Sequence, residues 1–285
     1  QNFWINGGVI QNDGLEGVIS YNANFRKLKW TPSLTFSYNR NRVLELSDLL
    51  NAEYFVLGYH RTHGNYLRRP KDGVYGAFGD IFGKVYLKNP DGSYQTNDKG
   101  IPLVSDFEDQ YIGNANPKVL AGFNNTLKYG PLILSFLIDS RFGGLMFDRT
   151  EVWLDYKGLS KKTGDARDAG GVLVNGTLVD TREFYLNQTG SGNLPVATEY
   201  FYDATNIRLR ELTLGYKFSP WGKNQNTATL SFVGRNLLFF YKKSPIDPEV
   251  GVGASPSVEG SANFTLPSTR YYGLSLNIGL NSSKK

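Results

Sequence analysis

The sequence predicts an all-β fold of long antiparallel strands. Residues 272–280 carry a large apolar side chain at every even position and Gly, Ser or Asn at every odd one, which is the period of a strand with one apolar face. Aromatic residues make up 14% of the chain and glycines number 32, a composition that favours strands and turns. No stretch approaches the ~20 consecutive apolar residues of a membrane-spanning helix, so a helical membrane protein is excluded.

About eight strands are expected from this alternation. Within residues 28–44, Leu34, Phe36 and Tyr38 alternate with small polar residues, and the stretch exceeds the ~5–6 residues of a typical soluble strand. Several strands approach or exceed the ~9–11 residues needed to cross a bilayer at a tilt. The expected strands are residues 4–10, 16–24, 28–44, 118–129, 132–141, 211–218, 227–238 and 271–280.

The connections between these strands are of two kinds. Short ones with turn residues are expected at residues 11–14, 129–131 and 219–226. Long ones are expected at about residues 47–116, 143–206 and 241–270, beyond the ~12–15 residues usual in a compact domain. Short turns at one end and long loops at the other are typical of a bacterial outer-membrane barrel, which we predict here. A secreted carbohydrate-binding β-sandwich shares the alternation and the loops, but the strand length opposes it.

Strand parity assigns side chains to the two faces of such a barrel. Leu274, Leu276 and Ile278 are expected to face lipid, and Ser275 and Asn277 to face a wet lumen.

Charged and aromatic residues on the strands are interpreted in the same way. The charged residues are expected on a solvated lumen wall, because a lipid-facing Arg at mid-depth costs roughly 2–4 kcal/mol. Arg208 and Arg210 share the parity of Leu212, so these two are expected at the membrane rim, beyond the apolar band. The charged residues are Arg208, Arg210, Glu211 and Arg235. An aromatic girdle at the membrane interface is expected at Trp30, Tyr129, Tyr216 and Trp221.

The sequence offers little for catalysis, cofactors or metals, and we predict that the protein is not an enzyme. Cysteine is absent, which excludes disulfides and thiolate sites. His60 and His63 lack the further ligands of a zinc site. Asp148, Glu151 and Asp155 are interpreted as solvated loop charges rather than a glycosidase carboxylate pair.

Two further features concern partners and export. The net charge of +5 is modest and its Lys and Arg residues are scattered, so nucleic-acid binding is not favoured. Residues 1–10 carry no basic segment followed by a cleavage site, and they begin at once with strand-like residues. We therefore expect that Gln1 is not a natural N-terminus.

A series of short motifs resembles one family, the SusC/RagA-type TonB-dependent transporters. Their number, order and spacing carry the resemblance, which spans essentially the whole chain. The motifs are Asn6-Gly7-Gly8, Asn12-Asp13-Gly14-Leu15-Glu16, Trp30, Asn39-Arg40-Asn41-Arg42-Val43, Ile112-Gly113-Asn114-Ala115-Asn116-Pro117-Lys118, Arg141-Phe142-Gly143-Gly144, residues 207–216, Gly234-Arg235-Asn236-Leu237, Asp247-Pro248-Glu249-Val250 and residues 267–271.

The resemblance implies a larger protein than this chain. Members of the family have a plug domain inside a 22-stranded barrel, so residues 1–285 resemble the C-terminal part of the barrel, without the plug. The family commonly ends on an aromatic residue, whereas here Leu280 is followed by polar residues.

The family also implies a function. It predicts a multi-pass protein of the outer membrane that imports oligosaccharides or peptides with a SusD-like surface lipoprotein and is driven by the TonB-ExbB-ExbD complex. A passive porin is the alternative. Loop aromatics are candidates for contacts to substrate or partner, namely Tyr54, Tyr59, Tyr66, Tyr75, Tyr86 and Trp153.

Overall fold

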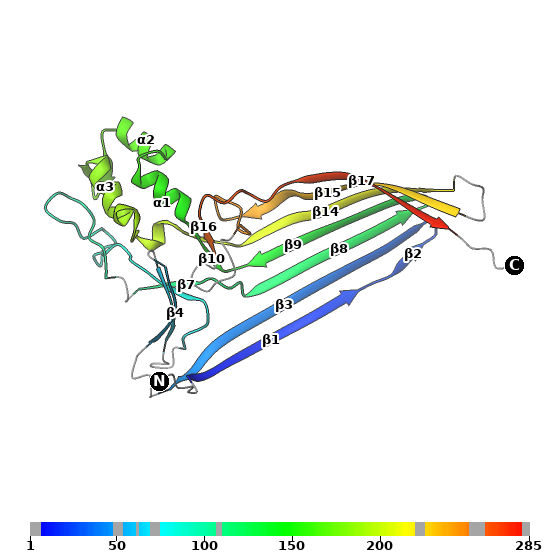
Figure 1. Ribbon diagram of the computed structural model, residues 1–285, viewed down its shortest axis with the longest axis horizontal. Coiled ribbons are helices and arrows are strands. Elements are labelled where there is room, and N and C mark those ends of the chain that lie inside the picture. The colour runs from blue at the N-terminus through cyan, green and yellow to red at the C-terminus, as the bar shows by residue number, and fades with distance from the viewer. Residues whose placement is uncertain are drawn as a thin grey trace, which may run out of the picture.

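The computed structural model describes residues 7–47, 54–60, 63–68, 75–106, 110–219, 226–250 and 260–280. Most of the long strands join one antiparallel sheet, in the order β1-β3-β8-β9-β14-β15-β17, with β2 paired to β3. The sheet is a curved wall of strands, and helices and short strands gather at one of its ends (Figure 1). Its strands are β1 (Gly8–Ser20), β2 (Ala23–Phe25), β3 (Leu28–Leu46), β8 (Val119–Tyr129), β9 (Leu132–Phe142), β14 (Asn206–Phe218), β15 (Asn226–Lys242) and β17 (Tyr271–Leu280). The predicted fold of long antiparallel strands is confirmed.

The predicted turn at residues 11–14 is wrong, because these residues lie inside β1. They pair with residues 39–42 of β3. The polar side chains that had indicated a turn interact with the neighbouring strand instead. Asn41 donates a hydrogen bond to Asn12 at 2.7 Å, and Arg42 forms an ion pair with Asp13 at 2.6 Å. The chain reverses later, at Arg26, whose φ is +51°.

The register confirms that the sheet has one apolar and one polar face. Residues directly opposite each other in neighbouring strands share a face. On one face, Leu274 is opposite Phe232, Phe232 is opposite Leu214, and Leu214 is opposite Leu134. Leu274 is 78% exposed, and Phe232 and Leu214 are exposed too, so the described residues leave this row of side chains uncovered. The next row, on the other face, runs through small and polar residues: Gly273, Val233, Thr213, Ser135, Thr126 and Thr31.

The expected parity of Arg208 with Leu212 is wrong. The register of β14 shifts between Leu209 and Glu211, so Arg210 is an extra residue in the ladder. Such a bulge reverses the alternation beyond it. Arg208 therefore lies opposite Asp139, on the polar face.

The predicted girdle residues lie near the short-turn end of the sheet. Tyr129 and Tyr216 both lie opposite Leu132, on the apolar face. The indole N–H of Trp30 donates to the side-chain oxygen of Asn125 at 2.9 Å, which satisfies a polar group on that face. Trp221 lies outside the described residues.

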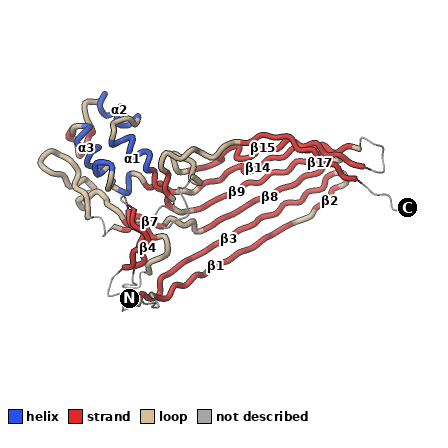
Figure 2. The backbone as a smooth tube through the Cα atoms, viewed as in Figure 1, coloured by secondary structure: helices blue, strands red, loops and turns tan. Residues whose placement is uncertain are grey.

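The three long connections at the other end contain secondary structure of their own (Figure 2). The first carries a four-stranded sheet of β4 (Tyr54–His60), β5 (His63–Arg68), β6 (Asp80–Phe82) and β7 (Tyr111–Asn114). The second and third share the sheet β13-β10-β16. The second also carries three α-helices and two 3-10 helices, Gly190–Gly192 and Ala197–Glu199, which were not predicted from the sequence. These elements are β10 (Leu145–Asp148), α1 (Arg149–Tyr156), α2 (Lys161–Asp168), β11 (Val172–Val174), β12 (Thr177–Val179), α3 (Thr181–Gln188), β13 (Phe201–Asp203) and β16 (Ser261–Ala262).

These connections pack into one unit, which we call the loop body. Phe147, Val152 and Tyr200 are fully buried in its core, and the ring of Phe201 lies 5.0 Å from that of Phe147. The first connection joins the second where the backbone N–H of Ala197 donates to the carbonyl of Lys84 at 2.6 Å. β10 pairs in parallel with β16, and this pairing joins the third connection to the second.

The interpretation of residues 148, 151 and 155 as solvated charges is wrong for the two aspartates. Asp148 is buried and caps α1, accepting from the backbone N–H of Glu151 at 3.0 Å. Asp155 is buried and accepts from the hydroxyl of Tyr200 at 2.8 Å. Both carboxylates therefore organise the loop body. Among the described residues, no helix is long and apolar enough to cross a membrane.

Candidate functional site

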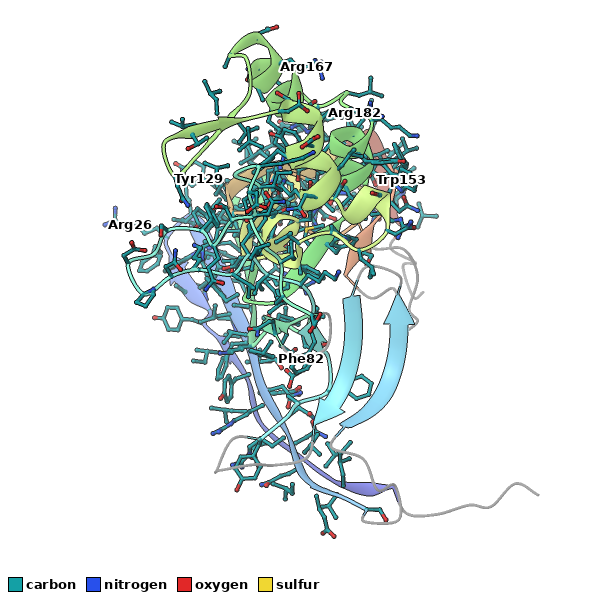
Figure 3. The ribbon with its side chains drawn as sticks, turned by 90° about the vertical axis from the view of Figure 1, so that its left-hand side faces the viewer. Arg26, Phe82, Tyr129, Trp153, Arg167 and Arg182 are labelled. Atoms are coloured by element: carbon teal, nitrogen blue, oxygen red, sulfur yellow. The ribbon has the colours of Figure 1, made fainter. Side chains whose placement is uncertain are left out.

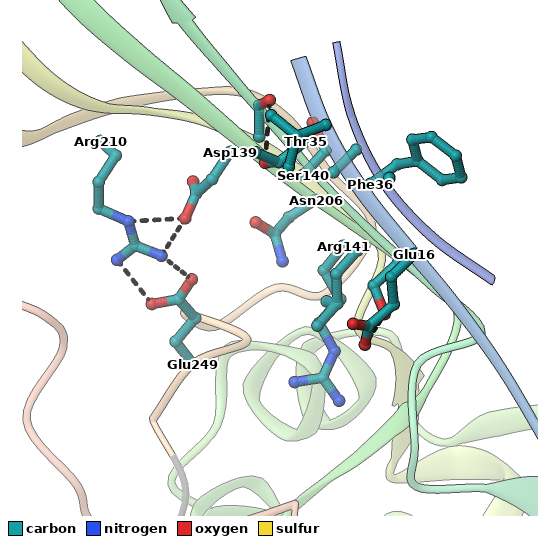
Figure 4. A pocket seen from close by; sticks show the side chains of 15 residues that line it. Glu16, Thr35, Phe36, Asp139, Ser140, Arg141, Asn206, Arg210 and Glu249 are labelled. Carbon is teal, nitrogen blue, oxygen red and sulfur yellow. Dashed lines mark hydrogen bonds and ion pairs between the residues drawn. The ribbon is translucent and has the colours of Figure 1, made fainter. Parts of the chain in front are cut away.

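A hollow of about 730 Å³ lies on the polar face of the sheet, where the strands meet the loop body. Its floor is formed by residues of β3, β8 and β9, including Thr35 and Ser37 on β3 and Gly122 on β8. Charged groups stand on its rim: Glu16, Asp139, Arg141, Arg210 and Glu249 (Figure 4).

Two arginines of β14 and two carboxylates form a charge cluster at this rim. Arg210 lies between the acids: its Nε is 2.7 Å from Asp139 Oδ2, and its Nη1 is 2.9 Å from Glu249 Oε2 (Figure 4). Arg208 is 1% exposed, forms an ion pair with Glu249 and lies 3.8 Å from Asp139. Its guanidinium also lies over the ring of Phe239, 5.1 Å from the centroid. The two cations and two anions leave the cluster with no net charge.

The cluster fastens the third long connection to the sheet. Glu249 belongs to that connection, whereas the other three members belong to strands β9 and β14. Next to it, Asp247 accepts from the backbone N–H of Ser268 at 3.2 Å, and Arg208 donates to the hydroxyl of Ser268 at 3.3 Å. The third connection is thus held at both of its ends, over the polar face.

The opposite rim is fastened by the strand exit after β9. Arg141 donates to the carbonyl of Ala115 at 3.1 Å, which joins the first connection to the sheet. Gly144 has a φ of +84°, and a Cβ there would lie 2.8 Å from the same carbonyl, so the sharp exit requires glycine. The first and third connections, which border the hollow, are therefore both bonded to the sheet.

The candidate aromatics of the sequence analysis lie in different environments. Tyr86 is only 8% exposed, and its hydroxyl donates to Gln188 at 2.9 Å. Tyr75 is exposed, with the guanidinium of Arg42 over its ring at 5.7 Å. Trp153 lies at the outer side of the loop body, half-buried beside Arg149 (Figure 3). None of these three lines the hollow.

The side chains of the other three candidates, Tyr54, Tyr59 and Tyr66, lie outside the described part of the structure. Their backbone belongs to the β4–β5 hairpin, in which Val56 is opposite Tyr66, and His60 is opposite His63. No group of three or more potential metal ligands is found in the described part of the chain.

Tyr86 belongs to a buried hydrogen-bond chain that crosses the loop body. Gln188 donates to Tyr200 at 3.1 Å, and Tyr200 donates to Asp155, which also forms an ion pair with Lys162 at 3.0 Å. Burial raises the pKa of Tyr86 and of Tyr200, so both phenols stay protonated. Burial acts to lower the pKa of Lys162, but its bond to Glu151 and the charge of Asp155 outweigh burial and raise it.

Asp139 and Glu249 were not predicted from the sequence as parts of a site. A signal for the cluster was present, because Arg210 and Glu211 are adjacent charged residues within a strand that otherwise alternates. Two charges in succession indicate a bulge, but the sequence does not reveal which distant carboxylates face it.

No model of a known protein family matches the chain. Three proteins of Formosa agariphila match nearly all of it. TonB-dependent receptor P3 is 24% identical over 95% of this chain and 29% of the receptor. TonB-dependent receptor P39 is 23% identical over 97% of this chain and 31% of the receptor, and TonB-dependent receptor P26 is 25% identical over 96% and 29%. The chain is related to the TonB-dependent receptors. The resemblance predicted from the motifs is thereby confirmed.

Solved structures give the same fold for this relative of the TonB-dependent receptors. A chain of the RagAB peptide importer in the "closed-closed" state matches with a TM-score of 0.63 at 13% identity, over 96% of this chain and 30% of that chain. A chain of the RagAB peptide transporter matches with a TM-score of 0.60 at 15% identity, over 96% and 29%. The chain thus spans 29% to 31% of the length of the receptors it matches.

Proposed function

We propose that this chain is the C-terminal part of the barrel of a TonB-dependent importer in a bacterial outer membrane. The observation that carries the proposal is the sheet itself, with one uncovered apolar face, one polar face and a loop body anchored at one end. The apolar face meets lipid and the polar face lines the lumen. Among the described strands, β1 and β17 each have one neighbour in this sheet, so further strands of the same protein would close the barrel.

The loop body is assigned to the extracellular side. Bacterial barrels have short periplasmic turns and longer extracellular loops, and the connections at residues 47–116, 143–206 and 241–270 share one end of the sheet. The hollow beneath them lies between the loop body and the lumen wall, where cargo would pass. The cargo is a nutrient of the oligosaccharide or peptide class, and the peptide class is supported by the similarity to the RagAB peptide importer.

The import machinery includes partners outside this chain. A plug within the barrel would connect it to the TonB-ExbB-ExbD complex, and a SusD-like lipoprotein would cover the loop body. Five aromatic residues are proposed as contacts for the lipoprotein or the cargo, since aromatic residues are enriched at such interfaces: Tyr54, Tyr59, Tyr66, Tyr75 and Trp153. Tyr86 is not included in this set, because its hydroxyl donates a hydrogen bond to Gln188 inside the loop body.

Dependence on energy tests the importer against a passive porin. In cells that carry the full-length protein, uptake of the cognate nutrient is expected to stop when a protonophore collapses the inner-membrane proton gradient. A porin passes its solute down a concentration gradient, so it needs no such gradient. Uptake that continues at the same initial rate would favour the porin.

Labelling tests which face meets lipid. Spin labels on single cysteines at Leu274 and Ser275 are expected to differ in the reconstituted full-length protein. The label at Leu274 should be relaxed mainly by oxygen, which is concentrated in lipid, and the label at Ser275 mainly by a water-soluble relaxer. Equal accessibility at the two positions would contradict the assignment.

Docking of the SusD-like lipoprotein tests the proposed aromatic contacts. Trp153→Ala is expected to reduce co-purification of the lipoprotein several-fold, because an amphipathic contact residue at the outer side of the loop body is removed. Tyr86→Phe is the matched control, since it changes a buried group. The opposite pattern, with loss only in Tyr86→Phe, would assign docking to the internal order of the loop body.

A further inference from the structure

Among the described residues, the charged side chains at the short-turn end of the sheet are all positive. Arg26, Lys27 and Lys29 lie in or beside the turn between β2 and β3, Lys128 lies at the end of β8, and Lys217 lies at the end of β14. All five side chains are exposed, and none of them forms an ion pair with a described residue. The described segments of this end contain no Asp or Glu: residues 21–31, 126–133, 213–219, 226–231 and 275–280.

Three of these cations belong to the polar face. Lys29 lies directly opposite Lys128, and Lys128 lies opposite Ile133, which in turn lies opposite Gly215. Lys217 lies beyond Gly215 on the same strand and shares its face. These three residues therefore form a lysine patch that points away from the apolar face, toward the interior of the proposed barrel.

The lysine patch is unfavourable in this sheet alone. Like charges that lie directly opposite in neighbouring strands are destabilising, as for Lys29 and Lys128. Nearer the loop body, by contrast, cations of the sheet have anionic partners. Arg235 forms an ion pair with Glu211 at 3.0 Å, and Arg42 forms one with Asp13. Among the described residues, the polar face offers no anion to the lysine patch, so a compensating carboxylate would come from another surface.

We propose that the lysine patch docks an acidic surface of the same protein, from the part that lies outside residues 1–285 and fills the barrel near its periplasmic mouth. This inference rests on the proposed function, and it names the chemistry of the contact. The matching receptors are far longer than this chain, which covers 29% to 31% of them, so such a part has ample length. Anionic lipid is disfavoured as the partner, because the three lysines lie on the face opposite to the apolar one.

Zero-length cross-linking with a carbodiimide tests this in the full-length protein, purified in neutral detergent. The reagent joins a lysine to a carboxylate only when the two are in contact. Lys29, Lys128 and Lys217 are expected to cross-link to Asp or Glu residues outside residues 1–285, and 1 M NaCl is expected to reduce the yield, because the Debye length falls to about 3 Å. Lys161, which pairs with Asp165 at 2.5 Å in α2, is the internal positive control.

Two outcomes would overturn the proposal. One is a Lys161–Asp165 cross-link with none from the lysine patch. The other is protection of the three lysines from acetylation in vesicles that contain phosphatidylglycerol but not in phosphatidylcholine vesicles, which would assign the patch to anionic lipid. The readout does not depend on transport, so a failure of energised uptake and a failure of this contact are distinguishable.

Discussion

Replacing Arg208 with alanine is expected to lower the free energy of unfolding of the full-length protein by about 3–5 kcal/mol, as when one partner of a buried ion pair is removed. Arg208 is 1% exposed and lies between Glu249 and Asp139. Without it, two carboxylates share the single cation of Arg210. The third connection should then detach from the sheet. The measurement is urea unfolding of the reconstituted protein, with limited proteolysis of residues 243–270 as a local readout.

Arg235→Ala is the matched control for this effect. Arg235 also pairs with a glutamate across β14 and β15, but its side chain is 63% exposed. Exposed ion pairs contribute about 0–1 kcal/mol, so the loss should be much smaller. A double-mutant cycle of Arg208→Ala with Glu249→Gln should show strong coupling between the two sites. Equal losses in Arg208→Ala and Arg235→Ala would contradict the role given to burial.

Phe147→Ala is expected to unfold the loop body and leave the strands in place. Phe147 is fully buried in the core with Val152 and Tyr200, and a Phe→Ala change in a core costs about 3–5 kcal/mol. In the full-length protein, residues 143–206 should become sensitive to protease. The heat-modifiable band of an assembled barrel should remain, because the hydrogen bonds of the sheet are not touched.

Leu173→Ala is the control for this second change. Leu173 lies in β11 of the same loop body, but it is 69% exposed. Surface substitutions of this kind usually change stability by about 0.5 kcal/mol or less. Loss of the barrel band in Phe147→Ala would show that the loop body and the strands fold as one cooperative unit.

The sequence was sufficient to predict most of the long strands and their faces, because the period of two is a local property of the chain. The bulge at Arg210 was missed because it depends on the pairing of β14 with β9. The turn at residues 11–14 was wrongly predicted for a related reason. Its polar residues lie at the end near the loop body, where they bond to β3, and local composition does not distinguish this from a turn.

The helices of the loop body were missed, although two of them carry a local signal. Asp148 and Glu151, and again Asp180 and Glu183, have the spacing of a residue that caps a helix followed by an acid in the first turn. Each helix is only eight residues long, too short to show an apolar period. The charge cluster could not be predicted, since it joins β9, β14 and the third connection.

The parallel pairing of β10 with β16 makes the central sheet of the loop body depend on two distant parts of the chain. β10 directly follows β9, whereas β16 lies beyond β15 in the sequence. The N–H of Phe147 donates to the carbonyl of Gly260, which comes after both β14 and β15. We therefore expect a chain that is truncated before residue 260 to leave the sheet β13-β10-β16 one strand short.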